Sequence, residues 1–158
     1  RDVATPLEIR RTFATPDRSC DITRQGCHPK RRHTCLVAVV GWTASRTRQR
    51  DMAALTLALP DEHGQLHFAG DVGTGFTAAT RRELLELLAE RAQPSPAIAV
   101  PTGRSRWASP TPMHLRRWVR PGLIGEIAHR QRTPDGRFRH PSWRGLRPDR
   151  DLDDLDPV

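Results

Sequence analysis

The chain has 158 residues, the size of one domain, with 36% hydrophobic residues and 14 prolines. This composition predicts a modest core and short elements joined by turns. The net charge of +8 favours a polyanionic partner such as nucleic acid, the alternative being a basic protein without one. No apolar run approaches the ~20 residues of a membrane span, and no signal-peptide core is present, so we expect a cytoplasmic protein without membrane contact.

The cysteines and the single lysine limit the chemistry that the chain can carry. Cys20, Cys27 and Cys35 lie near two histidines, but they form no C-x-x-C pair and fit no common zinc pattern. We therefore expect free thiols in a reducing compartment and no metal site. Lys30 is the only lysine, so a reaction that needs a lysine nucleophile has one candidate.

The first third of the chain predicts an irregular segment followed by three strands. Residues 1–34 are polar and rich in arginine, without apolar periodicity, which favours disorder. Three apolar or alternating runs then predict strands. They cover residues 36–40, 53–59 and 66–72, and the turn at 60–64 predicts that the second and third strands form a hairpin.

A helix is expected after the third strand. Gly73-Thr74-Gly75 lacks the Lys-Ser/Thr of a phosphate-binding loop, so we interpret it as a tight turn. Thr77 is a suitable N-cap, and the helix should end before Pro94. Its predicted apolar stripe consists of Leu84, Leu85, Leu87, Leu88 and Ala92.

The last third predicts a long loop and two more strands. Residues 94–117 are rich in Pro, Ser and Arg and predict a loop. Strands are expected over 123–132 and 137–143, joined by the turn Thr133-Pro134-Asp135-Gly136. From Asp149 the chain is acidic and is expected to be a solvated end.

Three strands, a helix and two strands form the element order of a mainly β protein. This order predicts a five-stranded OB-fold Greek-key barrel with one helix between strands 3 and 4, an architecture that binds oligonucleotides and oligosaccharides. We expect residues 35–150 to form this OB-fold, after a basic segment (1–34) and before an acidic tail (151–158).

Three stretches resemble the C-terminal OB domain of bacterial ATP-dependent DNA ligases, including the end-joining type. The first is residues 70–77 at the junction between strand and helix, and the second is Trp118-Val119-Arg120-Pro121. The third, residues 133–150, is similar to the closing hairpin and the last nucleotidyltransferase motif. The resemblance covers roughly residues 35–152 and implies a nucleic-acid-binding part of a ligase that acts in DNA repair.

The last motif implies a role in orienting pyrophosphate. The family's usual Arg-x-Asp-Lys is here Arg147-Pro148-Asp149-Arg150. By resemblance, Arg147 and Arg150 would stabilise the pyrophosphate that leaves ATP, and Asp149 would orient an arginine. Arginine in place of lysine keeps the charge but changes a point ammonium into a planar fork. The alternative is a solvated basic strand end.

The nucleotide-accepting lysine of the family has no counterpart here. Lys30 falls where the family's upstream Trp-x-Lys-x-Lys-like segment has its second lysine, within Gly26-Cys27-His28-Pro29-Lys30. By this resemblance residues 1–34 would be the end of an adenylation domain, with Lys30 near phosphate. The alternative is that Lys30 belongs to the basic cluster Lys30-Arg31-Arg32. No Lys-x-Asp-Gly is present to form the lysyl-adenylate. We therefore expect ATP and Mg²⁺ to be used only with a separate adenylation domain.

Arginines and tryptophans supply the candidates for contact with DNA, and nicked duplex is the favoured form. Arginine contacts to phosphates give salt-dependent affinity with little sequence readout. The candidates are Arg46, Arg48, Arg50, Arg104, Arg106, Arg137, Arg139 and Arg144. Trp107, Trp118 and Trp143 could stack on bases, although we expect Trp118 to be a packing residue.

Three interpretations remain open from the sequence. The chain is a ligase part that acts with a catalytic domain in trans, a stand-alone OB-fold module that binds nucleic acid, or an inactive remnant of a ligase. Binding to nicked rather than single-stranded DNA separates the first from the second, and binding to neither indicates the third.

Overall fold

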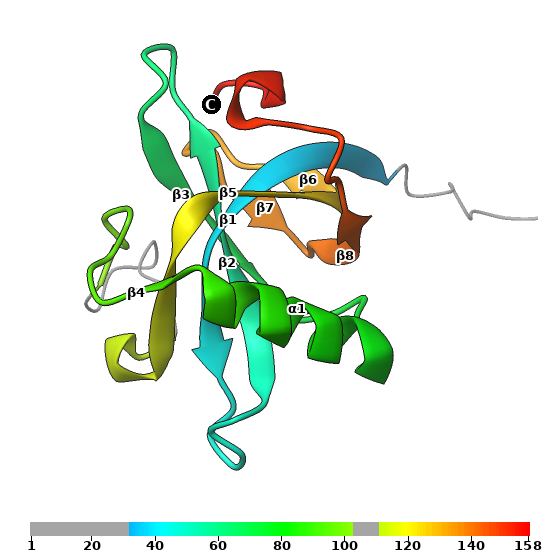
Figure 1. Cartoon of the computed structure of the whole chain (residues 1–158). Helices are drawn as coiled ribbons and strands as arrows, with labels where there is room; N and C mark the ends of the chain where they lie inside the picture. Colours follow the sequence, from blue (N-terminus) through cyan, green and yellow to red (C-terminus); the bar gives the residue numbers. More distant parts are fainter. Residues whose placement is uncertain (1–31, 103–110) are drawn as a thin grey trace, which may run out of the picture.

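The computed structural model describes residues 32–102 and 111–158, which form a curved antiparallel sheet with one long helix (Figure 1). The first half contains β1 (His33–Ala44), β2 (Met52–Pro60), β3 (Leu66–Val72), α1 (Ala78–Glu90) and β4 (Ala92–Gln93). The second half contains η1 (Met113–Leu115), β5 (Arg116–His129), β6 (Gln131–Arg132), β7 (Phe138–Arg139), β8 (Ser142–Leu146) and η2 (Leu152–Asp154). The predicted mainly β fold, with a helix after the third strand, is confirmed.

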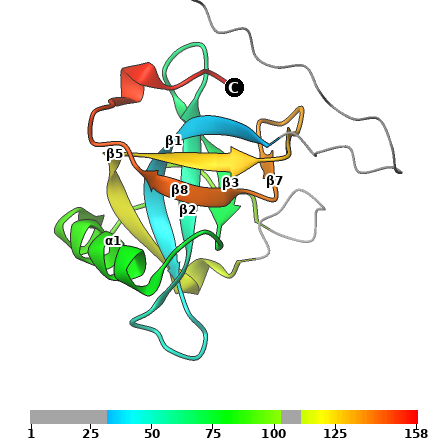
Figure 2. The same cartoon turned by 90° about the vertical axis from the view of Figure 1, so that its right-hand side faces the viewer.

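The sheet is centred on β1, which pairs with β2 on one side and β5 on the other. The strand order is β3-β2-β1-β5-β4, and β8 pairs with β5. The predicted hairpin of the second and third strands is confirmed by the pairing of β2 with β3. In both views, α1 lies on the side of the molecule away from the C-terminal segment, and the β1–β2 turn extends beyond the helix (Figures 1 and 2).

The junction between β3 and α1 meets β8 and joins the two outer parts of the sheet. The Trp143 amide donates to the Thr74 carbonyl at 2.9 Å, and the Thr74 hydroxyl donates to the Pro141 carbonyl at 3.2 Å. Gly75 has a φ of 92°, and a Cβ there would lie 2.4 Å from the Trp143 carbonyl oxygen. The predicted tight turn is confirmed, because only glycine fits both the left-handed backbone and this approach.

β1 is buried on both faces, which explains its nearly continuous apolar run. Val37 and Val39 belong to the core cluster that includes Leu84 and Leu88 of α1. Ala38 and Val40 belong to a second cluster on the other face, which is covered by Ile98, Trp118 and Leu155 among others. The helix that the leucine spacing predicts therefore fills one side of the sheet, with Thr77 as its N-cap accepting from the Thr80 amide.

β5 begins earlier than the sequence predicts, and the long loop is correspondingly shorter. The loop was expected to reach residue 117 and the strand to start at 123, but β5 runs from Arg116 through Pro121. Val39 pairs with Leu123 and Gly41 with Trp118, so residues 119–122 of β5 bulge opposite Val40. A bulge accommodates proline because no ladder hydrogen bond is required of its missing N–H.

The predicted single strand over 137–143 is wrong, because the chain divides it into β7 and β8. His140 has a φ of 52°, the one positive φ of a non-glycine residue in the described chain, and Pro141 follows it. The left-handed residue and the proline turn the chain between the two strands. β7 pairs with β6 as a hairpin, while β8 joins the main sheet through β5.

The segment after Arg150 is more ordered than the expected solvated tail. Its aspartates are exposed, but Leu155 packs in the second core cluster with 6% of its surface accessible. The Val158 amide donates to the Pro60 carbonyl at 2.8 Å. The charge pattern alone did not reveal this docking, because one buried leucine among acidic residues has no periodic signature.

Candidate anion and nucleic-acid interface

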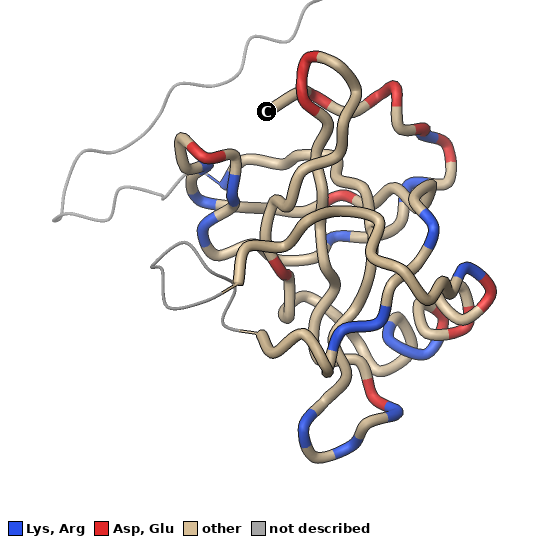
Figure 3. Tube along the Cα trace, turned by 90° about the vertical axis from the view of Figure 1, so that its left-hand side faces the viewer, with Lys and Arg blue, Asp and Glu red and all other residues tan. Residues whose placement is uncertain are grey.

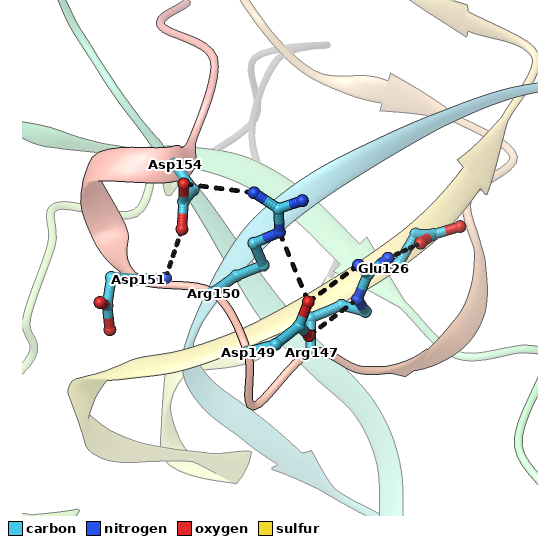
Figure 4. A network of polar contacts seen from close by, with 6 residues as sticks. All are labelled: Glu126, Arg147, Asp149, Arg150, Asp151 and Asp154. Atoms are coloured by element: carbon cyan, nitrogen blue, oxygen red, sulfur yellow. Dashed lines mark hydrogen bonds and ion pairs between the residues drawn. The ribbon is translucent and has the colours of Figure 1, made fainter.

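The motif residues Arg147, Asp149 and Arg150 lie together at the end of β8, as the resemblance implied (Figure 4). The Arg147 guanidinium donates from Nη1 to Glu126 at 2.7 Å, and from Nε and Nη2 to the two oxygens of Asp149 at 3.1 Å each. Arg150 lies 3.6 Å from Asp149 and 3.4 Å from Asp154. We call these five residues the motif cluster.

The electrostatics of the motif cluster are dominated by pairing rather than by free positive charge. The hydrogen bonds that Arg147 donates to Asp149 and Glu126 raise the pKa of Arg147 well above its usual range. The Arg147 guanidinium in turn lowers the pKa of the Asp149 carboxyl. Two guanidinium groups thus face three carboxylates (Figure 4). Three of the five N–H donors of Arg147 are held by carboxylates, so a phosphate that takes these three positions would replace a carboxylate.

The arginines of the first loop lie apart from the motif cluster. Arg46, Arg48 and Arg50 are exposed in the turn between β1 and β2, which Figure 3 shows projecting from the molecule. Arg48 lies 3.9 Å from Asp51, with both side chains largely exposed. Such a pair is worth little in water, so this loop keeps most of its positive charge available.

The three arginines of the last hairpin region differ in their availability. Arg137 pairs with Asp135 at 3.2 Å and lies over the Phe68 ring. Arg139 on β7 and Arg144 on β8 are exposed. In both cartoon views, the β6–β7 hairpin is far from the β1–β2 loop (Figures 1 and 2). The predicted DNA-contacting arginines that the structure describes therefore lie in two separate regions rather than one.

A second group of basic residues, which the sequence did not identify, surrounds a hollow beside the β6–β7 hairpin. The hollow has a volume of about 400 Å³. Among the described residues no carboxylate lines it, and we call it the basic hollow. Its lining residues are Arg32, Thr74, Ala128, His129, Arg130, His140, Pro141 and Ser142. A second, smaller hollow of about 180 Å³ borders the motif cluster and includes Glu126 and Asp156.

The buried tryptophans are not available for base stacking in this conformation. Trp118 is 8% exposed and packs in the second core cluster, as expected. Trp143 is 3% exposed and stacks on Phe76 with ring centroids 5.7 Å apart. For Trp143 the stacking alternative is therefore wrong in this conformation, and its role is packing.

A buried ion pair holds residue Asp71, which lies in the stretch 70–77 that resembles the ligase family. Arg116, whose side chain is fully buried, donates to both carboxylate oxygens of Asp71 at 2.8 Å and to the Thr56 hydroxyl at 2.7 Å. A charged side chain is tolerated in a protein core when it is paired with an opposite charge and its polar atoms are hydrogen-bonded. This arginine therefore fixes β3 against β5 rather than contacting nucleic acid.

Several predicted candidates lie outside the described residues, namely Lys30, Arg104, Arg106, Trp107, Cys20 and Cys27. Within the described ranges, Cys35 is a half-buried free thiol whose pKa is raised by burial. In the same ranges no group of three metal-ligating side chains is found, and no helix is long and apolar enough to cross a bilayer.

Comparison with known proteins gives consistent matches. The family described as ATP dependent DNA ligase C terminal region matches residues 48–150. A multifunctional non-homologous end joining protein LigD of Mycolicibacterium smegmatis is 38% identical over 127 residues, which is 78% of this chain and 15% of the relative. The Pseudomonas aeruginosa LigD is 39% identical over 117 residues, covering 71% of this chain and 13% of that protein. The chain thus spans about one-seventh of these relatives.

Solved structures agree with the sequence comparisons. The ligase domain of M. tuberculosis LigD superposes with a TM-score of 0.68 at 31% identity, covering 80% of this chain and 39% of that one. A mycobacterial DNA ligase D complexed with ATP and MES gives a TM-score of 0.63 at 31% identity, covering 80% and 38% of the two chains.

Proposed function

The chain belongs to the family of ATP-dependent DNA ligase C-terminal regions, and from this premise we propose that it is the DNA-clamping domain of such a ligase. In this role it contributes to nick sealing in DNA repair and carries the arginines that orient the pyrophosphate of ATP. The observation that carries the proposal is the motif cluster, since the family match ends at Arg150 and the fold brings Arg147, Asp149 and Arg150 into contact.

The pairing in the motif cluster defines what the proposed role requires. Arg147 is held by Glu126 and Asp149, so pyrophosphate oxygens would take the place of the Asp149 oxygens on its Nε and Nη2. Pyrophosphate can replace the Asp149 carboxylate at low cost because this side chain is 58% exposed, so water can solvate the carboxylate once it is displaced. Arg150, 44% exposed, would then contribute the second cation.

The chain needs a partner for the complete reaction. Adenylation requires an amine nucleophile, and the single lysine, Lys30, does not stand in a Lys-x-Asp-Gly motif. ATP and its metal ion are therefore expected on a separate adenylation domain, either in the same polypeptide or in trans. The exposed arginines at the β1–β2 loop and beside β8 would contact the DNA backbone.

The proposal is tested by adding the chain to a separately expressed ligase adenylation domain and measuring lysyl-adenylate from radiolabelled ATP. We expect stimulation that the double variant Arg147→Ala/Arg150→Ala loses. Arg82→Ala, a change of an exposed arginine on α1, is the matched control and should stimulate normally. An absence of stimulation at every ATP concentration would contradict the pyrophosphate role.

A second candidate, a non-catalytic OB-fold module that binds nucleic acid, is favoured by one observation. The carboxylates of the motif cluster leave no unpaired cation there, whereas the β1–β2 loop keeps exposed arginines. Fluorescence anisotropy with nicked duplex, intact duplex and single-stranded DNA separates the two functions. Tightest binding to nicked duplex supports the ligase domain, and tightest binding to single strands supports the module.

A further inference from the structure

The basic hollow combines residues from four separate segments of the chain. β1 and β5 end side by side, because His33 pairs with His129 in antiparallel register. Arg32 and Arg130 therefore lie next to each other, one position beyond the last pair. On the other side of β5, Ser142 pairs with Ala128, and the junction residue Thr74 is tied to Pro141. The hollow is thus built by the tertiary fold and not by one loop.

Two guanidinium groups border the hollow, and among the described residues no carboxylate lines it. Arg32, Arg130 and His140 are exposed, and within residues 32–102 and 111–158 none of the three makes an ion pair. Arg139, whose carbonyl accepts from the Arg130 amide at 3.2 Å, adds a further exposed guanidinium beside it. Since guanidinium groups prefer phosphate and carboxylate oxygens as partners, the hollow is suited to an anion.

The backbone at His140 sets the position of its side chain. Its φ of 52° lies in the left-handed region, which histidine, asparagine and aspartate adopt more often than other non-glycine residues. Such conformations persist where the surrounding structure imposes them, and they concentrate at binding and active sites. Here the conformation turns the chain between β7 and β8 and places His140 in the lining of the hollow.

Two hydroxyl groups complete the lining, and the ring of His129 does not take part. Thr74 and Ser142 both border the hollow. The His129 ring instead packs on Phe138, with centroids 4.7 Å apart, and burial lowers the pKa of His129. The side chains that a ligand would meet are therefore the guanidinium groups of Arg32 and Arg130 and the imidazole of His140.

We propose that the basic hollow is a phosphate-binding site that holds one phosphate group of a DNA strand, with Arg32, Arg130 and His140 as its ligands. The identification of DNA as the source of the phosphate rests on the proposed function. The inference that the hollow binds a phosphate group rests only on the residues that line the hollow. The volume of about 400 Å³ admits a phosphate with its flanking sugar. The site is separate from the motif cluster, because the two share no residue.

The phosphate chemistry is tested with inorganic phosphate on the full chain, followed by amide chemical shifts. We expect saturable shifts at residues 130, 140 and 142, and their loss in Arg130→Gln and in His140→Asn. Asparagine tolerates the left-handed backbone, so the second variant removes the imidazole while keeping the turn. Arg82→Gln, an exposed charge change on α1, is the matched control. Identical shifts in Arg130→Gln and Arg82→Gln would overturn the site.

The DNA source is tested by anisotropy with three duplexes: intact, nicked with a 5′-phosphate, and nicked with a 5′-hydroxyl. Removing one phosphate contact should weaken binding roughly three- to tenfold and lower the slope of log affinity against log salt by about 1. We expect this for Arg130→Gln, little loss for Arg130→Lys, and none for Arg82→Gln. A loss limited to the 5′-phosphorylated nick assigns the site to a terminal phosphate, and an equal loss on all duplexes assigns it to the backbone.

The two proposals fail separately. If the chain binds nicked DNA and Arg130→Gln binds it equally well, the hollow is not a DNA-phosphate site while the proposed function stands. If the chain binds no DNA but shows the inorganic-phosphate shifts, the phosphate chemistry of the site stands while its DNA source and the proposed function fall.

Discussion

The motif cluster and the basic hollow both contain two arginines, but the surroundings of these arginines are opposite. In the motif cluster, Arg147 and Arg150 are held by three carboxylates at the exposed end of β8. In the basic hollow, Arg32, Arg130 and His140 make no ion pair within the described parts of the chain. An arginine in a recognisable motif is therefore not always available to an anion. If carboxylates already accept its hydrogen bonds, an anion has to displace them.

The two regions also differ in how they are attached to the fold. The hollow uses Thr74 and Ser142 at the closure between the β3–α1 junction and β8, where the packing is tight. The motif cluster lies on the surface and contacts the segment that Leu155 anchors through the ion pair of Arg150 with Asp154. Four predictions follow from this contrast, in order of decreasing expected effect.

The largest effect is expected from Gly75→Ala, which should disrupt the closure that supports the hollow. The added Cβ would lie 2.4 Å from the Trp143 carbonyl oxygen at a φ of 92°. We expect a loss of about 3 kcal/mol in the free energy of unfolding, measured by urea denaturation. Gly64→Ala is the control, because Gly64 shares a positive φ but has no atom within 4 Å of such a Cβ. It should cost only about 1 kcal/mol. Equal losses of unfolding free energy in the two variants would show that the β3–α1 junction and β8 are not tightly packed at Gly75.

Leu155→Ala tests whether the acidic segment is anchored over the motif cluster. Leu155 is 6% exposed, and truncating it should reduce the free energy of unfolding by about 2 kcal/mol. Leu152→Ala, at a residue that is 36% exposed, should cost less than about 0.5 kcal/mol. Amide exchange should also increase at residues 151–156 in the first variant alone. A stable Leu155→Ala protein with unchanged exchange would contradict the docking of this segment.

Glu126→Gln should make the motif cluster more like the basic hollow. The change removes the carboxylate that lies 2.7 Å from Arg147 Nη1, on a side chain that is 28% exposed. We expect the affinity for inorganic pyrophosphate to rise roughly two- to fivefold, the range of a partly exposed ion pair. Calorimetric titration measures it, and Glu83→Gln on the exposed face of α1 controls for net charge. The same rise in both variants would mean that the pairing is unimportant.

The smallest effect is a pH dependence that arises from Asp149. Its pKa lies below the ordinary value of 3.8 because Arg147 donates to the carboxylate. A lowered folded pKa stabilises the protein above the unfolded value, and this contribution disappears as the pH falls through the folded pKa. We therefore expect the loss of stability below about pH 4 to be slightly smaller in Asp149→Asn, because Asp61 and Asp135 also have lowered pKa values and keep their contributions. Parallel melting curves of both proteins between neutral and acidic pH measure this. No difference in slope would indicate that the pair does not form.

Much of the fold was predictable because the local signals were strong. The run at residues 36–40, the alternation over 66–72 and the Thr77 cap each specify one element, and all three are observed. The predicted strand boundaries were wrong where strand pairing in the folded sheet outweighed the preference of the local sequence. Pro121 predicts a break but is absorbed in a bulge of β5, and His140 and Pro141 divide a run whose residues read as one strand.

The mainly β class, the helix after the third strand and the adjacency of Arg147, Asp149 and Arg150 follow from residues close together along the chain, so the sequence is enough to predict them. Which of the described arginines are paired with carboxylates depends on the tertiary fold. Glu126 pairs with Arg147 across 21 positions, and the register of β1 with β5 brings Arg32 beside Arg130. Charge availability depends on partners distant in the chain, and periodicity carries no information about those partners.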